Sequence, residues 1–489
     1  MKKKIMANYI YSSFYQIILI IVPFITAPYL ARTLLPEAIS INSYVSAVVQ
    51  VFSLLGLLGL NNYSIREAAY ARDDKKKLSK VFSELISLRF ILLVITSIIY
   101  FVYAMLSEYK IYFLIQYIAV FSTFFDVSWL YIGLEEFKVT VTRSFIVKII
   151  NVTSIFLFIK SPDDLGLFMI ISTVYTVIGN FILYFGVKKR IGKLVFKNLN
   201  IRKHIKPILK LFLPYAASLV YLQMDKLMIK ALAPDVSIVG FYDQAERIVK
   251  IPLALITALS NVMLPRISNE FVKKNNEKIK KYINTSIVFS LLLSIPLMFG
   301  VFSISYTMIP WFLGNDYLDV IPIMMMLSPI VVFISLSSVT GTQYLTSVND
   351  TKTLTKSYIF GAIINLILNF IFIPIFGGVG AAIGTVAAEA TVFFVQFIFI
   401  KDVINKKDNF KLAVKYLLCG IFMTMVCSIV GIKMKPTVVT TLIQIVLGVI
   451  SYFGIILIIK DEFAFNLFKT FLNKMKQIIG RKSEQNEEK

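Results

Sequence analysis

Charged side chains recur inside segments of this chain that are otherwise apolar enough to cross a membrane. A charge near the centre of a bilayer is costly, so such residues usually face a cavity and carry function. The cations can bind an anionic group, while the acids orient them or titrate during transport. Alternatively, the two sets pair across helices and lock the fold. The cations are Arg89, Lys148, Lys226, Lys230, Arg247 and Lys250, and the acids are Glu84, Asp126, Asp225, Asp243, Glu246 and Glu389.

One stretch concentrates these charges. Asp243, Glu246, Arg247 and Lys250 are spaced at i, i+3, i+4 and i+7, which places all four on one face of a helix. That face is expected to line a bundle interface or a wet cavity rather than lipid.

The cations nearest the middle of their spans are the strongest candidates for function. They are Lys148, Arg247 and Lys250, followed by Arg89. Arg32, at the outer end of the first span, is placed to face the same cavity. The other intramembrane charges are interpreted as a mixture of structural pairs and functional groups.

The elements that must position these residues are membrane helices. Hydrophobic residues make up 57% of the 489 positions, and about fourteen apolar stretches are each near the 20 residues that a bilayer core requires. This pattern predicts an all-α polytopic membrane protein, with no room between spans for a soluble catalytic domain. The predicted spans are 9–31, 38–60, 81–106, 111–132, 139–159, 165–187, 211–233, 239–264, 283–306, 318–345, 357–376, 378–400, 412–432 and 437–459.

The net charge of +23 follows the predicted topology. With the N-terminus inside, about 40 of the 51 Lys and Arg residues fall in inner segments, as the positive-inside rule predicts. The basic character is therefore a topology signal that places both termini in the cytoplasm, and we expect no nucleic-acid partner. The outer segments hold only Arg32, Lys110, Lys160, Lys433 and Lys435.

An internal repeat divides the spans. Residues 34–44 read LLPEAISINSY and residues 232–242 read LAPDVSIVGFY, each in the first outer turn of a helical hairpin. The repeat predicts two parallel six-helix bundles, an arrangement typical of transporters, followed by two extra C-terminal helices. The predicted parts are an N-terminal lobe (1–187), a basic cytoplasmic linker (188–210), a C-terminal lobe (211–401), helices 13 and 14 (402–460) and a cytoplasmic amphipathic tail (461–489).

No motif for catalysis, a metal or a cofactor is apparent. Cys419 and Cys427 share one span and are interpreted as apolar packing residues, since two ligands are too few for a structural zinc site. His204 lies in the basic linker and is interpreted as a solvated side chain. Asn365 and Asn369 are expected to be hydrogen-bond partners between helices. We therefore expect a protein that is not an enzyme and binds neither a metal nor a cofactor.

Several segments resemble the polysaccharide (Wzx-type) flippases of the multidrug/oligosaccharidyl-lipid/polysaccharide exporter superfamily. The first is PYLARTLLPEAISINSY at 28–44, and the most distinctive is LPYAASLVYLQMDKLMIKALAPDVSIVGFYDQAERIVK at 213–250. Segments 61–89 and 125–165 also contribute. The sequence departs from many relatives at Leu35, where they carry glycine, and this departure concerns the local turn geometry.

The resemblance implies a flippase that moves undecaprenyl-diphosphate-linked oligosaccharide repeat units from the inner to the outer leaflet by alternating access, for capsule, exopolysaccharide or O-antigen assembly. It implies a multi-pass protein of a bacterial cytoplasmic membrane, acting as a monomer among membrane lipids, with polysaccharide polymerase and other assembly proteins as partners. The lipid tail would lie in a groove formed with the last two helices. The implied substrate contacts are Arg32, Arg89, Lys148, Lys226, Arg247 and Lys250, and the implied ion-coupling or cation-orienting groups are Asp126, Asp225 and Glu246.

Three rival functions stay open at this point. One is a structural scaffold for the synthesis complex, against which the charges on one face of the span at 239–264 argue. A multidrug/ion antiporter of the same superfamily should favour an acidic cavity, whereas this chain has as many intramembrane cations as acids. A polysaccharide polymerase or ligase typically carries a sizeable outer loop, and the longest one here, at about 307–317, is short.

Overall fold

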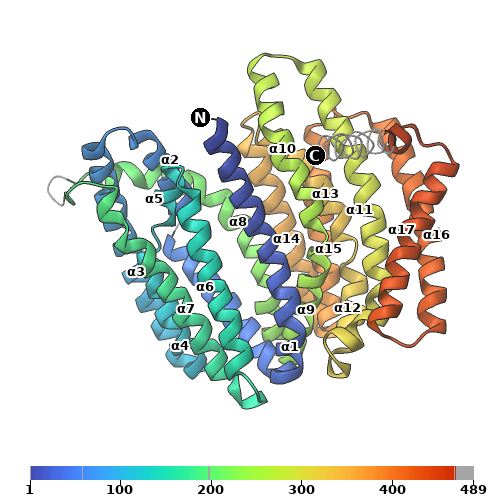
Figure 1. The fold of residues 1–489 in the computed structure, drawn as a ribbon, viewed down its shortest axis with the longest axis horizontal. Helices are drawn as coiled ribbons and strands as arrows, with labels where there is room; N and C mark the ends of the chain where they lie inside the picture. Colours follow the sequence, from blue (N-terminus) through green and yellow to red (C-terminus); the bar gives the residue numbers. More distant parts are fainter. Residues whose placement is uncertain (1, 58, 196–198, 467–468, 470–489) are drawn as a thin grey trace, which may run out of the picture. The chain divides into compact units, whose positions relative to one another are not determined.

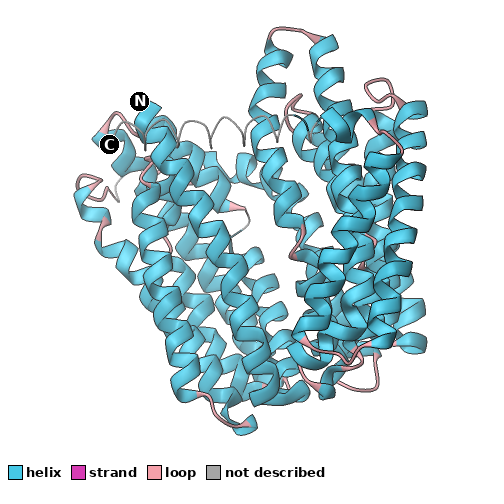
Figure 2. Ribbon diagram, turned by 45° about the vertical axis from the view of Figure 1, so that its right-hand side comes forward, coloured by secondary structure: helices cyan, strands magenta, loops and turns pink. Residues whose placement is uncertain are grey.

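The computed structural model describes residues 2–57, 59–195, 199–466 and 469, and its described side chains begin at Val22, with gaps within 210–222 and 255–261. Every regular element in the described chain is helical, and no strand occurs in it (Figure 2). The all-α expectation is confirmed. Nearly all of the predicted amphipathic tail at 461–489 lies outside the described residues.

Each predicted span coincides with a helix or with a run of short helices (Figure 1). The α-helices are α1 (Lys2–Leu57), α2 (Leu60–Ala71), α3 (Lys75–Leu106), α4 (Lys110–Ser122), α5 (Ser128–Gly133), α6 (Phe137–Phe158), α7 (Leu165–Phe185), α8 (Arg202–Leu232), α9 (Ser237–Lys250), α10 (Leu253–Val272), α11 (Asn276–Phe312), α12 (Val320–Leu327), α13 (Ile330–Ser337), α14 (Thr351–Phe376), α15 (Gly378–Phe399), α16 (Lys406–Lys433) and α17 (Val438–Ile458). The 3₁₀ turns are η1 (Thr123–Phe125), η2 (Pro162–Asp164), η3 (Val187–Lys189) and η4 (Asn315–Tyr317), and η5 (Ser338–Leu345) is a π-helix.

Within the described residues, eleven helices or helix runs are long and apolar enough to cross a membrane. The run Val22–Leu57 counts once although it holds parts of two predicted spans, and the spans predicted at 211–233 and 239–264 are not among the eleven. The chain is therefore a multi-pass membrane protein.

Three predicted spans are interrupted. The span at 111–132 consists of α4, η1 and α5, the span at 239–264 consists of α9 and α10, and the span at 318–345 contains α12, α13 and η5. Interrupted helices at membrane depth expose backbone groups that must find other partners, and they often mark functional regions.

Contacts divide the chain into two compact units. The first comprises Met1–Gln244, Phe312–Val320 and Tyr358–Ala388. In it α1 packs against α3, α6 and α8, and α4 and α6 both pack against α7. Its inner core includes the stacked rings of Phe82 and Trp129, whose centroids are 5.4 Å apart. This unit contains α8, which the repeat assigns to the second bundle. The units group helices by contact and the lobes group them by repeat, so the lobe boundaries stay a prediction.

The second unit comprises Ala245–Trp311, Ile321–Ser357 and Glu389–Lys489. Its core joins α10, α11, η5, α16 and α17, and the Tyr452 hydroxyl of α17 donates to the Leu292 carbonyl of α11 at 3.2 Å. Cys419 and Cys427 are buried in this core as free thiols, which confirms that they are packing residues.

Leu35 forms the turn inside α1 and adopts φ 65° and ψ 169°. This conformation is essentially restricted to glycine, because a Cβ atom meets the backbone there, and it costs roughly 1–3 kcal/mol. The glycine of the family pattern therefore suits this turn better than the leucine that is present.

We expect Leu35→Gly to raise the free energy of unfolding by about 1 kcal/mol, since relief of the strain exceeds the greater unfolded-state entropy of glycine. Thermal unfolding of the purified protein measures this. The control is Ala233→Gly at the equivalent repeat position, where φ is −87° and glycine should bring no gain. Equal shifts for both variants would contradict the strain argument.

Candidate functional site

The first charged pair of the candidate site joins α8 to α9. The Lys226 ammonium lies 2.6 Å from Asp243 Oδ1, and the Ser43 hydroxyl of α1 donates to Asp243 Oδ2 at 2.7 Å. Both charged side chains are buried, and a buried charge is tolerated when it is paired and hydrogen-bonded. One predicted substrate contact is thus held by one of the predicted intramembrane acids.

A close helix crossing lies next to this pair. The Gly240 amide of α9 donates to the Ser40 hydroxyl of α1 at 2.8 Å. A Cβ atom added at Gly240 would lie 2.2 Å from Ser40 Oγ and 3.1 Å from the Ser40 backbone nitrogen, so only glycine fits without displacement. These residues belong to the two copies of the repeat, which therefore contact each other at this crossing.

Asp225 of α8 accepts hydrogen bonds from four side chains. Tyr242 Oη and Thr385 Oγ1 lie 2.6 and 2.7 Å from its Oδ2, while the amide nitrogens of Asn365 and Asn369 lie 2.9 and 2.6 Å from its Oδ1. The side chain is 1% exposed. Within the described residues Asp225 forms no ion pair with Lys or Arg, so neutral donors alone stabilise its negative charge.

The cluster around Asp225 draws on four helices and only one copy of the repeat. Tyr242 is the repeat tyrosine of the second copy, and the repeat offset places Ala27 at the position equivalent to Asp225. The tyrosine of the first copy, Tyr44, instead lies 2.7 Å from the Tyr103 hydroxyl. The carboxylate site therefore has no counterpart in the first repeat.

Two acids and a cation of the predicted set lie in other local arrangements. Glu246 is buried and pairs with Lys250 one helical turn away in α9. Asp126 interrupts the run from α4 to α5, and its side chain accepts from the Ser128 amide at 3.0 Å.

The remaining predicted cations differ in exposure. Arg32 and Arg247 are exposed and Lys148 is half-buried. Arg89 is 1% exposed, and its guanidinium donates to protein acceptors. The described contacts do not bring all six predicted cations into one cluster.

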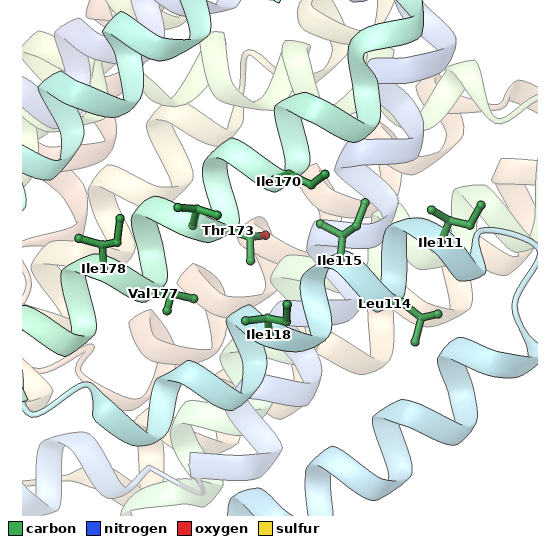
Figure 3. Close-up of a pocket in the computed structure, with 9 residues that line it drawn as sticks. Ile111, Leu114, Ile115, Ile118, Ile170, Thr173, Val177 and Ile178 are labelled. Carbon is green, nitrogen blue, oxygen red and sulfur yellow. The ribbon is translucent and has the colours of Figure 1, made fainter. Parts of the chain in front are cut away.

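Two apolar grooves occur among the described residues, one in each unit. In the second unit, a groove of about 470 Å³ lies between α11, α13, α15 and α16, and Lys406 and Asn409 supply its polar lining. In the first unit, a groove of about 550 Å³ lies between α4 and α7 (Figure 3). Its lining is aliphatic except for Thr173, so it suits a hydrocarbon chain and offers no charge to a phosphate.

Comparison with models of known protein families shows which family this chain belongs to. The family model "Polysaccharide biosynthesis protein" matches residues 5–271, more than half of the chain, and the MatE model matches residues 211–371. The chain belongs to the polysaccharide biosynthesis protein family. The resemblance inferred from the sequence is thereby confirmed.

Relatives of this polysaccharide biosynthesis protein include two proteins that are named as O-antigen transporters. The chain is 26% identical over 377 residues to a Shigella dysenteriae protein named "Putative O-antigen transporter", covering 76% of this chain and 93% of that one. It is 25% identical over 410 residues to an Escherichia coli K12 protein of the same name, covering 82% and 98%.

Solved structures share the fold. The lipid II flippase MurJ in an inward closed conformation aligns with a TM-score of 0.73 at 21% identity, over 95% of this chain and 100% of that one. An inward-facing multidrug resistance MATE transporter aligns with a TM-score of 0.62 at 15% identity, over 79% and 95%.

The interpretation of His204 as a solvated side chain was wrong. His204 is 0% exposed, its Nε2 lies 3.0 Å from Glu84 Oε2, and its Nδ1 lies 2.7 Å from the Tyr63 hydroxyl. Lys203 also pairs with Glu84, at 2.6 Å. The surrounding lysines suggested solvent, whereas the contacts come from α2 and α3, far away in sequence. Burial raises the pKa of Tyr63 to about 12.

The sequence analysis also missed Thr385 and Tyr242 as hydrogen-bond partners of Asp225. Asn365 and Asn369 were correctly predicted to be hydrogen-bond partners between helices, and their spacing of four residues was the available signal for a shared acceptor. Nothing local marks Thr385, because its partner lies on α8.

Asp461, just after α17, is expected to give a pH-dependent contribution to stability. Burial favours its neutral form, but hydrogen bonds from Lys415 Nζ at 2.8 Å and the Ala464 amide at 3.0 Å outweigh this and lower the pKa of the carboxyl. Because the folded-state pKa is depressed, the stabilisation is present above the ordinary aspartate pKa and lost as pH falls through the folded value.

We therefore expect Asp461→Asn to lower the free energy of unfolding by about 2 kcal/mol at pH 7. The difference from wild type should shrink below about pH 4. Thermal unfolding between pH 3 and 8 checks this, and Glu462→Gln is the matched control. A deficit that is constant down to pH 3 would contradict the assignment.

Proposed function

We propose that this protein is a flippase that moves undecaprenyl-diphosphate-linked oligosaccharide repeat units from the inner to the outer leaflet for surface polysaccharide assembly. The observation that carries the proposal is membership of the polysaccharide biosynthesis family together with buried charges in membrane helices. Relatives named as O-antigen transporters support it. The activity is transport by alternating access, not catalysis.

The diphosphate of this substrate carries the charge that the protein must stabilise while it crosses the membrane. Arg32, Lys148, Lys226, Arg247 and Lys250 are the proposed contacts, since charge-assisted hydrogen bonds to phosphate are strong. Lys226 pairs with Asp243, so the diphosphate would compete with that carboxylate for the ammonium. Such an exchange of partners can link substrate binding to movement between helices.

Asp225 is the proposed coupling site, with Asp126 and Glu246 as cation-orienting groups. Hard cations take oxygen ligands. The hydroxyl oxygens of Thr385 and Tyr242 surround the Asp225 carboxylate, and the amide nitrogens of Asn365 and Asn369 face it. The Asn369 oxygen is buried and has no hydrogen-bond partner in the described part of the chain. Rotation of that amide would turn a donor into a further oxygen ligand.

The groove beside α16 is the proposed place for part of the isoprenoid tail. Its walls are apolar, and Lys406 stands at the beginning of α16, where a cation and the helix N-terminus both favour an anion. This places the tail next to the first of the two extra C-terminal helices.

The finer topology is also part of the proposal. It comprises fourteen membrane helices in two parallel six-helix lobes (1–187 and 211–401), two added helices within 402–460, and both termini on the cytoplasmic side of a bacterial membrane. The protein acts as a monomer beside the polymerase and other assembly proteins.

The rival function is a multidrug/ion antiporter, favoured by the MatE match to residues 211–371 and by the MATE-like fold. A drug exporter for cationic compounds should present an acidic binding surface. The paired and exposed cations described above fit an anionic substrate better.

Deletion of the gene in its host tests the proposal. We expect undecaprenyl-diphosphate-linked repeat units to accumulate on the inner leaflet while surface polysaccharide is lost, with both restored by the intact gene. Single repeat units displayed on the outer leaflet would instead indicate a polymerase or ligase. Unchanged polysaccharide with altered drug tolerance would indicate the antiporter.

A further inference from the structure

Two breaks between consecutive helices of the first unit lie next to the same side chain. The first interruption follows α1, which ends at Leu57; Gly59 is left-handed with φ 74°, and α2 begins at Leu60. The second separates η1 from α5, where Asp126 is extended with φ −72° and ψ 95°. Each interruption removes intrahelical hydrogen bonds, and the freed backbone groups need other partners in an apolar interior.

Arg89 of α3 reaches both interruptions. Its Nη1 donates to the Asp126 carbonyl at 2.7 Å, and its Nη2 donates to Asn61 Oδ1, in the first turn of α2, at 3.2 Å. The planar guanidinium carries five donors in a fixed fork, so one side chain can hold two acceptors on different helices. Lysine, with a compact ammonium, cannot reproduce this geometry.

The segments beyond the two interruptions pack as one piece. α2 and α5 lie side by side at one end of α3 (Figure 1). A Cβ atom added at Gly133 of α5 would lie 2.7 Å from Ala68 Cβ and 2.8 Å from the Ile65 carbonyl oxygen of α2. Arg72, at the end of α2, and Glu135, just after α5, form an exposed ion pair of 2.8 Å between the same two helices. These close contacts couple the two helices to each other.

We propose that Arg89 is a positioning residue that pins these two interruptions, so that the α2–α5 pair moves as one rigid end-piece during transport. The substrate does not contact Arg89. Its side chain is 1% exposed, and its Nη1 and Nη2 are directed at protein acceptors, while its buried Nε has no hydrogen-bond partner among the described residues. This role replaces the substrate contact that the family resemblance implies for Arg89, and it rests on the proposed flippase function only for its consequence in transport.

Hydrogen exchange of the full-length protein tests the pin without any transport assay. For Arg89→Ala we expect amide exchange to rise about tenfold at both 57–61 and 123–130, as loss of roughly 1.4 kcal/mol of local stability implies. Asn61→Ala should loosen only 57–61. Arg72→Ala, which removes the exposed ion pair between the same helices, should change neither segment.

Transport distinguishes positioning from substrate contact. Purified variants in liposomes would receive undecaprenyl-diphosphate-linked repeat units extracted from the deletion strain. We expect Arg89→Ala to lower the maximal rate about tenfold with the half-saturating concentration unchanged. Arg89→Lys should lower the maximal rate by a smaller factor, and Asn61→Asp, which keeps an acceptor for Nη2, should stay near the wild-type rate. If Arg89→Ala does not fold, Arg89→Lys and Asn61→Ala carry the same comparison.

Two results would overturn the proposal. One is unchanged exchange at either segment in Arg89→Ala or Arg89→Lys. The other is a raised half-saturating concentration with an unchanged maximal rate, which would make Arg89 a substrate contact. If the wild-type protein moved no repeat units at all, the flippase function would fail, while the exchange pattern would still decide whether Arg89 pins the two interruptions.

Discussion

Replacing Asp225 by asparagine should reduce transport at least about 100-fold while leaving the protein in the membrane. The carboxylate accepts hydrogen bonds from Tyr242, Thr385, Asn365 and Asn369. Asparagine has the same shape, but its amide group would face donors. It would also remove the charge that a coupling cation requires. A hydrogen bond to a charged group contributes roughly 1.5–3 kcal/mol, so weakening this network is among the larger single-residue effects.

Complementation of the deletion strain and transport in liposomes measure this effect. Asp235→Asn is the matched control, because Asp235 is an exposed acid of the same unit whose described contact is to the Ser237 amide. A second readout is thermal stability in Na⁺, K⁺ and choline buffers, since a bound ion stabilises the folded state by mass action. Wild-type transport by Asp225→Asn would refute the coupling role, as would an ion-dependent melting temperature that this variant retains.

Replacing Gly240 by alanine is expected to reduce the transport rate about tenfold or more and to lower the free energy of unfolding by about 1–3 kcal/mol. The added Cβ would lie 2.2 Å from Ser40 Oγ and within 3.2 Å of the Ser40 backbone. The crossing of α1 and α9 would have to open, and with it the Ser43–Asp243 hydrogen bond.

Ser40→Gly in the same chain should restore part of the loss, because it removes the closest atom but leaves the backbone approach. Gly166→Ala is the control, since a Cβ at Gly166 meets no heavy atom within 4 Å and alanine is the better helix former. An equal loss in Gly240→Ala with and without Ser40→Gly would show that the crossing is not the cause.

The positions of the helices were largely predictable from the sequence, because long apolar runs leave few alternatives in a bilayer. The interruptions were not. Gly59 is a possible helix-end signal after Leu57, but nothing in the composition around Asp126 distinguishes a broken run from a continuous helix. The group that contacts both breaks, Arg89, lies on another helix.

The candidate site was predictable by residue type but not by partner. The balance of intramembrane cations and acids indicated ion pairs, and Lys226 does pair with Asp243. Asp225, one residue before Lys226, accepts hydrogen bonds from neutral groups instead. Its partners Thr385 and Asn365 lie 140 or more positions away, so the local sequence does not reveal them. His204 was misread for the same reason, since a lysine-rich segment is buried only where another helix supplies an acid such as Glu84.

Ala27 stands at the position in the first repeat that is equivalent to Asp225. The proposed coupling site therefore has no second copy, which bears on the free energy available for each transported substrate. With a single carboxylate cluster, one monovalent ion would be exchanged for each substrate. Moving one elementary charge through 100 mV yields about 2.3 kcal/mol, and each factor of ten in a concentration ratio requires about 1.4 kcal/mol. That one ion, moving through the membrane potential, could by itself sustain about a 50-fold excess of repeat units on the outer leaflet. Outward movement of the negatively charged diphosphate, which an inside-negative potential also favours, would add to this excess.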